Sequence, residues 1–449
     1  MRNKTICINI LALIPIALLL FSCDINNEKE QIKNQPNIVL IISDDQAWID
    51  YSFMGHPVIE TPRIDKLSGE ALTFTRGYVV APLCRPSLAS ISTGLYPHQH
   101  GITGNDPQFE SDNKRYSKEW SEKRSELSSR FTSKFRSNPA ITDLLTQKDY
   151  VSFQTGKWWE GSWQNGGFTE GMTHGDWSRG GRHGDEGLKV SREGMQAVFN
   201  FMKNAKDKQK PFFVWHAPFM PHTPHTPPDS LFQKYLSLAD HEREAKYMAM
   251  VEWFDITVGQ LLDFLEVNEL EENTLVIYVC DNGWITNPDP KNGGSFLPRS
   301  KQSPYEMGIR TPIMYKWPGV IKPLVDTSTF VSSIDIVPTI LDAVGLAKTD
   351  KMQGINVLDS ALLKKRKMVF SEDFMHDMKD INDISSSLES RVILKSPWKL
   401  IVPYSLNNKK EVELFHIIND PHEKNNLFQE FPQVVRELSM EMNDFWVPN

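Results

Sequence analysis

Two short, almost uninterrupted apolar runs constrain the fold of this chain more than any other feature. They are Asn37–Ile42 (NIVLII) and Thr274–Cys280 (TLVIYVC), and the runs Pro211–Trp215 and Thr311–Trp317 have a similar pattern. Strands that are covered on both faces of a sheet are apolar throughout, whereas strands with one wet face alternate. Helical stretches lie between these runs. We therefore predict an α/β fold with a large, mostly parallel sheet sandwiched by helices.

The helical stretches are recognised by their apolar spacing and by a start signal. Apolar residues recur every three or four positions from Met248 to Leu265, and Pro62 stands where a helix capped by Thr61 would begin. Residues 107–138 are charged and serine-rich, which predicts an excursion or lid rather than core. Residues 161–187 are rich in Gly, Trp and His, which predicts a long functional loop or a poorly ordered one.

The C-terminal part of the chain changes to short strands. They are expected at Arg391–Lys395, Trp398–Val402 and Val412–His416, and a last helix is expected at Pro432–Trp446. The 449 residues exceed what one hydrophobic core usually supports. We therefore predict a small C-terminal subdomain, made of an antiparallel sheet and a helix, beside the large α/β domain.

The N-terminus has the pattern of an export signal. Arg2 and Lys4 precede an apolar stretch from Ile6 to Phe21 that is a little short for a membrane span. The stretch ends in Leu20-Phe21-Ser22-Cys23, which resembles the box at which bacterial lipoproteins are cleaved and lipidated. The prediction is a lipid anchor on Cys23 that attaches the protein to a membrane. A plain signal peptide and an uncleaved anchor remain as alternatives.

Charge and cysteine content narrow the partners and the compartment. The chain has 49 basic and 57 acidic side chains; removing residues 1–22 takes away Arg2 and Lys4, which leaves 47 against 57, a net charge of −10. This acidic balance argues against a nucleic-acid partner. The mature chain would keep only Cys23, Cys84 and Cys280, too few for a disulfide framework, and Cys280 is expected to be a small buried hydrophobe.

Oxygen-bearing side chains follow both apolar runs directly. Asp44 and Asp45 come after the first, and Asp281 and Asn282 come after the second. Ligand sites in α/β sheets lie just beyond the carboxyl ends of the strands, and three carboxylates with an amide oxygen suit Ca²⁺ or Mg²⁺. Ordinary turn residues at strand ends are the alternative interpretation.

A third motif begins at Cys84, in the run Cys84-Arg85-Pro86-Ser87. A helix is predicted to start at Cys84 and to end near Gly94, which places a helix N-terminus and its partial positive charge at the cysteine. The run continues as Ser92-Thr93-Gly94-Leu95-Tyr96-Pro97-His98. From about Asn37 to the C-terminus, the chain resembles the formylglycine-dependent sulfatases of the alkaline-phosphatase-like superfamily.

The resemblance implies a set of roles for residues of this sequence. Cys84 would be oxidised to formylglycine by a formylglycine-generating, sulfatase-maturating enzyme, and the aldehyde hydrate would attack sulfur. Asp44, Asp45, Asp281, Asn282 and the modified Cys84 would bind Ca²⁺, with Mg²⁺ as an alternative. Lys157 and Lys301 would hold the sulfate, and His222 would protonate the leaving oxygen.

The resemblance also implies an activity, and the N-terminal pattern implies a location. We expect an exported sulfatase that hydrolyses sulfate esters of a carbohydrate, in the periplasm or on the cell surface of a bacterium. The expected division is a signal over residues 1–22, a flexible tether over 23–35, the catalytic domain over 36–345 and the subdomain over 346–449. Further residues that could contact the sugar are Asp106, Asp185, Glu186, His225 and Arg299, with Trp163 beside them.

Two positions depart from the family pattern. Leu88 stands where the family usually has an arginine, and Trp159 stands where it usually has a histidine that serves as a base. Candidates to replace these two side chains are His98, His100, His183 and Arg85. The departures leave two alternatives open: a phosphoester or phosphonate hydrolase of the same superfamily, and a catalytically inactive lipoprotein that binds sulfated glycans.

Overall fold

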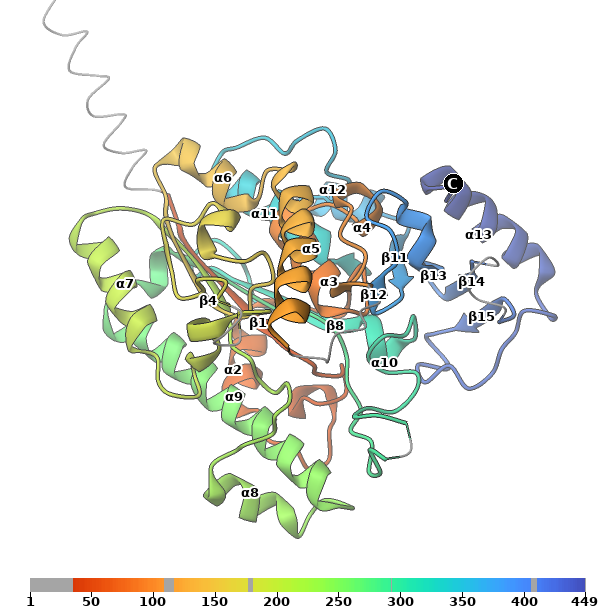
Figure 1. The fold of residues 1–449 in the computed structure, drawn as a ribbon, viewed down its shortest axis with the longest axis horizontal. Helices are drawn as coiled ribbons and strands as arrows, with labels where there is room; N and C mark the ends of the chain where they lie inside the picture. The colour runs from red at the N-terminus through yellow and green to blue at the C-terminus, as the bar shows by residue number, and fades with distance from the viewer. Residues whose placement is uncertain (1–34, 109–116, 177–180, 292, 405–409, 449) are drawn as a thin grey trace, which may run out of the picture.

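A nine-stranded sheet forms the centre of the molecule (Figure 1). The computed structural model describes residues 35–108, 117–176, 181–291, 293–404 and 410–448. Within them the strand order is β10-β2-β8-β7-β1-β6-β4-β5, with β9 paired to β2. The strands are β1 (Asn37–Ser43), β2 (Leu72–Tyr78), β4 (Val151–Gly156), β5 (Glu170–Gly171), β6 (Phe212–Ala217), β7 (Thr274–Cys280), β8 (Arg310–Lys316), β9 (Leu324–Asp326) and β10 (Val331–Ser332).

The sheet is mostly parallel, as predicted. β8 is the exception, because it runs antiparallel to both β2 and β7. The two strongest apolar runs are the neighbouring strands β1 and β7, and every residue of both is buried. Their parallel register pairs Asn37 with Thr274 and Ser43 with Cys280, so the two strands end at the same level.

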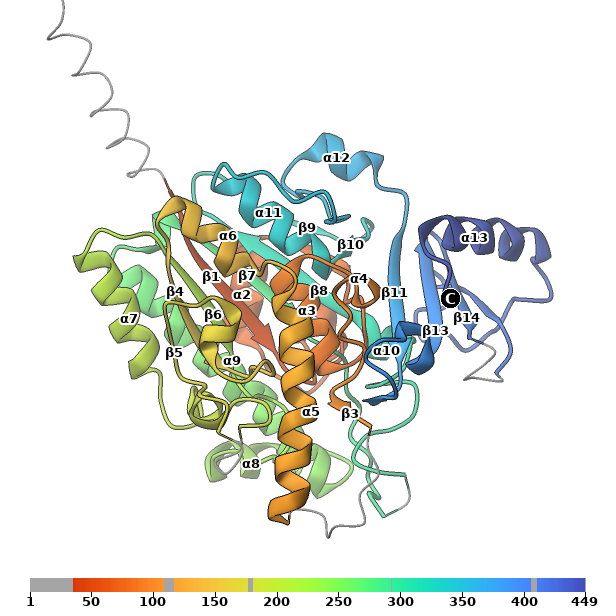
Figure 2. The same cartoon turned by 45° about the horizontal axis from the view of Figure 1, so that its top comes forward.

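Helices cover both faces of the sheet (Figures 1 and 2). Along β1, Ile38, Leu40 and Ile42 pack on one face, and Val39 and Ile41 pack on the other, which explains why the whole strand is apolar. The first face carries α3 (Cys84–Thr93), α5 (Lys118–Arg136), α6 (Ile141–Leu145) and α11 (Ile336–Ala343), and the second carries α2 (Pro62–Glu70), α7 (Gln196–Asp207) and α9 (Glu242–Val267).

Shorter elements connect this framework. The remaining helices before the C-terminal sheet are α4 (Pro97–His100), α8 (Asp229–Leu236), α10 (Glu306–Ile309) and α12 (Ser360–Lys365). The 3-10 turns are η1 (Ser52–Met54), η2 (Thr146–Lys148), η3 (Trp163–Gly166), η5 (Asp185–Lys189), η6 (Glu271–Asn273), η7 (Ser333–Asp335) and η8 (Ile384–Ser387).

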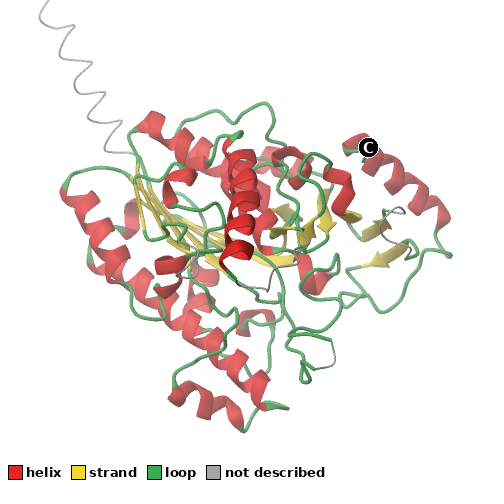
Figure 3. Ribbon diagram, in the orientation of Figure 1, coloured by secondary structure: helices red, strands yellow, loops and turns green. Residues whose placement is uncertain are grey.

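A small antiparallel sheet follows near the C-terminus, again as predicted (Figure 3). Its strands are β11 (Val369–Phe374), β13 (Leu388–Lys395), β14 (Trp398–Pro403) and β15 (Glu413–His416), and the last helix α13 (Pro432–Phe445) packs on β13 and β14. A second pairing joins β3 (Asp106–Pro107) to β12 (Asp377–Met378), so the C-terminal part of the chain also reaches back to the segment after α3.

Two local expectations were wrong. Residues 118–136 are not an excursion but the helix α5, whose Phe131 and Phe135 enter the main core. Serine and charged residues dilute the apolar period of this helix, so only its last two turns carry a core signal. Thr61 stands before α2 but its side chain makes no capping bond; the Asp255 carboxylate of α9 accepts from the N–H groups of Arg63 and Ile64 instead.

Residues 161–176 and 181–187 form loop structure, as expected, with η3, β5 and the start of η5 in it, and residues 177–180 lie outside the described residues. The predicted export signal, Cys23 and nearly all of the tether lie outside the described residues, and the proposed domain boundaries stay predictions. No helix in the described ranges combines the length and the apolar character that crossing a membrane requires.

Candidate active site

The acidic cluster forms because β1 and β7 end side by side. Asp44 and Asp45 leave β1 where Asp281 and Asn282 leave β7, and all four side chains are buried. Asp45 has a left-handed backbone (φ 65°), which turns its N–H toward Asp281 Oδ1 at 3.2 Å. Asn282 Nδ2 donates to Asp45 Oδ1 at 2.7 Å. The two strand ends therefore make one cluster rather than two separate turns.

Glycine is required beside this cluster. A Cβ on Gly283 would collide with the backbone oxygen of Met307, and the N–H of Gly283 donates to the carbonyl of Gly308 at 2.9 Å. This close approach fixes the end of β7 against the segment that carries Lys301.

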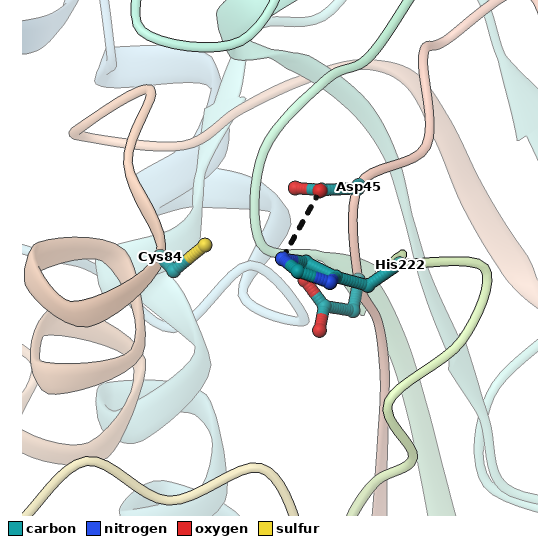
Figure 4. A group of neighbouring side chains, drawn as sticks. Asp45, Cys84 and His222 are labelled. Carbon is teal, nitrogen blue, oxygen red and sulfur yellow. Dashed lines mark ion pairs between the residues drawn. The ribbon is translucent and has the colours of Figure 1, made fainter. Parts of the chain in front are cut away.

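The N-terminus of α3 faces the cluster (Figure 4). Cys84 is the first residue of α3, and Gly94 ends the helix in a left-handed conformation, both as predicted. Ligand atoms of Asp44, Asp45, Cys84 and His222 all lie within 4.8 Å of one another. Figure 4 shows Cys84 pointing from the helix toward Asp45 and His222.

Two buried lysines complete the charge pattern. Lys157 Nζ lies 2.5 Å from Asp44 Oδ1 and 3.4 Å from Asp281 Oδ2, and Lys301 Nζ lies 2.5 Å from Asp45 Oδ1. Burial lowers the pKa of each lysine, but the adjacent carboxylates outweigh it, so both pKa values are raised and both side chains are ammonium ions. Fixed cations of this kind can hold an anionic group.

The residues at the cluster fit a divalent cation. When fully ionised, the three carboxylates outnumber the two ammonium groups in this buried site. Asp44 Oδ2, Asp45 Oδ2 and Asn282 Oδ1 are buried and have no hydrogen-bond partner among the described residues. Burial also raises the pKa values of Asp44 and Asp281, which Lys157 only partly offsets. A hard cation would satisfy these oxygens and relieve their crowding.

His222 presents one ring nitrogen to the site. Its Nδ1 lies 2.6 Å from the carbonyl oxygen of Thr223, which fixes Nδ1–H as a donor, and its Nε2 lies 3.4 Å from Asp45 Oδ2. Burial, followed by the charges of Lys301 and Lys157, lowers the pKa of His222 well below its usual value. Phe219 stacks on the imidazole with ring centres 4.2 Å apart.

The Cys84 thiol itself is not activated. Burial raises its pKa to about 11, although Lys157 and Lys301 lower it. A thiol with that pKa is protonated at neutral pH and is a weak nucleophile.

The further sugar-contact candidates lie around this site with different partners. Asp106 forms ion pairs with Arg124 and Arg182. Asp185 accepts hydrogen bonds from the backbone N–H groups of the loop that begins at His174. Glu186 pairs with Lys189, and Arg299 donates to the carbonyl of Glu423. His225 packs beside Tyr247 and Trp284, and its Nε2 has no hydrogen-bond partner among the described residues. Their roles as sugar contacts stay predictions.

The structure shows what surrounds Leu88 and Trp159, the two positions that depart from the family pattern. Leu88 is buried in the apolar core. Trp159 and His183 pack edge to face with their ring centres 5.2 Å apart. The ring centres of His183 and His222 are 6.5 Å apart, so Trp159 connects to the cluster through His183. Of the four candidate replacements, His183 is the one that lies in this neighbourhood.

The other three candidates have structural partners. Arg85 is buried and forms a two-pronged ion pair with Glu160, with nitrogen–oxygen distances of 2.8 and 2.7 Å. His100 lies 2.9 Å from Ser90 Oγ, and His98 pairs with Glu372 while stacking on Trp446.

Sequence reasoning missed two arginines. Arg182 binds Asp106 and stacks over Trp159, and Arg192 donates to the carbonyls of Phe219 and His222, which holds the His222 segment in place. No sequence signal marks them, because their partners are distant along the chain. For Arg182, the unusual composition of residues 161–187 was an indirect indication, whereas Arg192 lies outside that segment.

Comparison with known proteins places this geometry in a family. A profile described as "Sulfatase" matches residues 36–346, and one described as "N-sulphoglucosamine sulphohydrolase, C-terminal" matches residues 298–446. The chain is 28% identical to N-acetylgalactosamine-6-sulfatase of Canis lupus familiaris over 73% of this chain and 66% of that protein, just under two thirds of its length. It is 22% identical to N-acetylgalactosamine-6-O-sulfatase of Bacteroides thetaiotaomicron over 96% of this chain and 97% of that protein.

Solved structures share the fold. The crystal structure of Ps i-CgsB superposes with a TM-score of 0.70 at 24% identity, covering 92% of both chains. The phosphonate monoester hydrolase of Agrobacterium radiobacter superposes with a TM-score of 0.65 at 16% identity, covering 91% of this chain and 95% of that one.

Proposed function

This chain belongs to the sulfatase family, and we propose that it hydrolyses sulfate esters of a carbohydrate. The observation that carries the proposal is the meeting of Asp44, Asp45, Cys84 and His222 within 4.8 Å, with Lys157 and Lys301 beside them. The carbohydrate substrate is supported by the relatives, which include N-acetylgalactosamine-6-sulfatases and an endo-4-O-sulfatase.

Cys84 acts in this proposal as formylglycine, whose hydrated aldehyde supplies the oxygen nucleophile that a protonated thiol cannot supply. Asp44, Asp45, Asp281 and Asn282 would hold Ca²⁺, which supplies charge stabilisation when bound. The chain's own residues do the rest. Lys157 and Lys301 orient the sulfate and neutralise its oxygens, and His222 Nε2, protonated once the anionic sulfate is bound, delivers that proton to the departing sugar oxygen.

Mass spectrometry of the peptide that contains residue 84 tests the modification. Protein produced together with a sulfatase-maturating enzyme should show loss of sulfur and gain of oxygen at Cys84. The same protein should release sulfate from an aryl sulfate and from sulfated oligosaccharides. Unmodified Cys84 together with glycan binding but no sulfate release would instead support the inactive-lipoprotein alternative, which the departures at Leu88 and Trp159 motivate.

A phosphoester or phosphonate hydrolase is the second candidate, because a phosphonate monoester hydrolase has the same fold. Matched aryl sulfate and aryl phosphate substrates separate the two. A higher kcat/KM on the phosphate would reverse our choice.

The proposed location is the periplasm or cell surface of a bacterium, through a lipid on Cys23. The lipoprotein box in the sequence supports it. The variant Cys23→Ser, produced in a bacterial host, should move from the membrane fraction to the soluble fraction.

A further inference from the structure

A second pocket adjoins the candidate active site. It has a volume of about 440 Å³ and lies between α5 and the loop that follows Trp159. One wall is the hydroxyl-bearing face of α5. The opposite wall includes Asn165 and His174, and Trp159 and Arg182 line it as well. Serine and threonine hydroxyls, an amide and an imidazole are groups that hydrogen-bond sugar hydroxyls.

Arg182 supplies a fixed cation to this pocket. Its Nε donates to Asp106 Oδ1 at 3.1 Å and its Nη2 to Asp106 Oδ2, while the guanidinium stacks over Trp159 at 4.8 Å from the ring centre. Asp106 is held in turn by Arg124 at 2.7 Å. The guanidinium has five N–H groups and these contacts use two of its nitrogens, so donors remain for a ligand. The side chain is still 33% exposed, which leaves it accessible from the pocket.

Trp159 offers a second indication of a ligand. Only 6% of the surface of Trp159 is exposed. Its indole Nε1–H is buried and has no hydrogen-bond partner among the described residues. A buried donor without a partner is costly unless something satisfies it. A sugar hydroxyl in the pocket that Trp159 lines would do so.

The pocket is linked to the reaction site through the same residues. His183 follows Arg182 directly, meets Trp159 at 5.2 Å and lies 6.5 Å from His222, measured between ring centres. The Trp159 side chain therefore lies between the pocket and the two histidines, His183 and His222, of the candidate active site. The Arg182 guanidinium is also close enough to Cys84 for their charges to interact, so a sugar next to one bound at Cys84 would extend toward this pocket.

We propose that this pocket is a subsite for an anionic sugar unit adjacent to the unit whose sulfate ester is hydrolysed, with Arg182 binding its carboxylate or sulfate group. This inference rests on the proposed function and extends it from a single sulfated unit to an oligosaccharide.

Ser129→Phe tests the subsite, because Ser129 is exposed on the pocket wall of α5 and a phenyl ring there would fill the space. Ser121→Phe is the matched control, on the same helix but outside the pocket lining. Thr132→Phe is a second blocking variant if the first fails to fold. Binding of chondroitin 6-sulfate and ulvan tetrasaccharides to the full, matured protein would be measured by calorimetry, together with kcat/KM on these and on an aryl sulfate.

We expect the blocking variants to weaken tetrasaccharide binding by about tenfold or more, the scale of a lost charge-assisted hydrogen bond. The ratio of tetrasaccharide to aryl sulfate kcat/KM should fall in parallel, and Ser121→Phe should match the wild type. Equal binding by Ser129→Phe and Ser121→Phe overturns the subsite, as does failure of the wild type to bind either tetrasaccharide. Binding without any sulfate release overturns the proposed function and leaves the subsite standing.

The carboxyl-reduced tetrasaccharide identifies the anion. Weaker binding of the reduced form assigns a carboxylate to Arg182, and unchanged binding assigns a sulfate. Both outcomes count for the subsite only when Ser129→Phe weakens binding.

Discussion

At the residue scale, the candidate site depends on side chains whose ordinary chemistry is altered by burial. His222 is the clearest case. Its Nδ1 is occupied by the carbonyl of Thr223, so Nε2 is the nitrogen left for chemistry, and it faces Asp45 and Cys84. Burial and the two lysines lower the pKa of His222, so in the free site the ring is neutral with its proton on Nδ1. The negative charge of a bound sulfate ester opposes that shift, and Nε2 must gain a proton there before it can protonate the leaving oxygen.

His222→Ala should therefore separate substrates by their leaving group. We expect kcat on a sulfated sugar to fall by about 10²- to 10⁴-fold, the usual contribution of a general acid. The loss on an aryl sulfate should be much smaller, because a phenolate leaves without a proton. Steady-state kinetics on both substrates check this, and His416→Ala, in the C-terminal sheet, is the control. Equal losses on both substrates would argue against the proton-donor role.

At the element scale, the small C-terminal sheet fixes the segment that carries Lys301. Lys399 of β14 is fully buried and lies 2.8 Å from Glu423 Oε1 and 3.3 Å from Glu306 Oε1, and Glu306 begins α10, five residues after Lys301. Glu423 also accepts from the N–H of Glu306 at 2.7 Å. The sheet thereby reaches into the active-site region through one buried charge network.

Lys399→Met should destabilise the protein and reduce activity together. It leaves the buried Glu423 without its cation and Glu306 with Arg310 alone, 3.6 Å away, and breaking such a network costs about 3–5 kcal/mol. Chemical denaturation and kcat/KM measure the two effects. The triple variant Lys399→Met/Glu306→Gln/Glu423→Gln removes the uncompensated charges and should recover part of the stability. A single variant as stable as the wild type would contradict this account.

A second prediction at this scale concerns the start of α2. Burial raises the pKa of Asp255, which accepts from Arg63 and Ile64, to about 7, above the value of 3.8 for an unperturbed aspartate. The folded state therefore binds the proton more tightly, so the contribution of this group to stability is complete below pH 3.8 and is lost as the pH rises through about 7. The Asn side chain in Asp255→Asn does not titrate. The free energy of unfolding of this variant, measured by urea denaturation, should therefore increase relative to that of the wild type as the pH rises from about 4 to about 8. A constant difference across that range would show that Asp255 does not titrate there.

At the scale of the whole molecule, the sheet brings distant segments to one edge and leaves an excess of buried negative charge there. Asp281 and Lys301 come more than two hundred residues after Asp44 and Asp45 in the sequence. Asp281 meets them because β1 and β7 are parallel neighbours. A cation bound at this edge would couple binding to the stability of the whole fold.

Removal of the cation should lower both activity and thermal stability. Ca²⁺ at about one hundred times its Kd should stabilise the folded state by about 2.7 kcal/mol. Thermal unfolding with EDTA, and again after addition of CaCl₂ or MgCl₂, measures the effect. Asp281→Ala should unfold at the same temperature with or without Ca²⁺; an undiminished Ca²⁺ response in that variant would place the cation elsewhere.

The sequence by itself determined the elements and the chemistry of the cluster. Runs that are apolar at almost every position, such as β1 and β7, indicate strands covered on both faces, so the α/β class and the central strands followed directly. The positions of Asp44, Cys84 and Asp281 at element ends were equally visible, because local patterns mark where a strand ends and where a helix begins.

Only the tertiary structure decided what surrounds that cluster. It placed Asp255 at the start of α2, gave Arg85 to Glu160, and brought Arg182 onto Trp159. These contacts join residues that no periodicity or spacing relates, and each depends on how loops and helices pack over the sheet. The physical reason is that the apolar pattern of a strand or helix shows which of its faces is buried. The partner of a buried charge, in contrast, comes from a chain segment that is distant in the sequence.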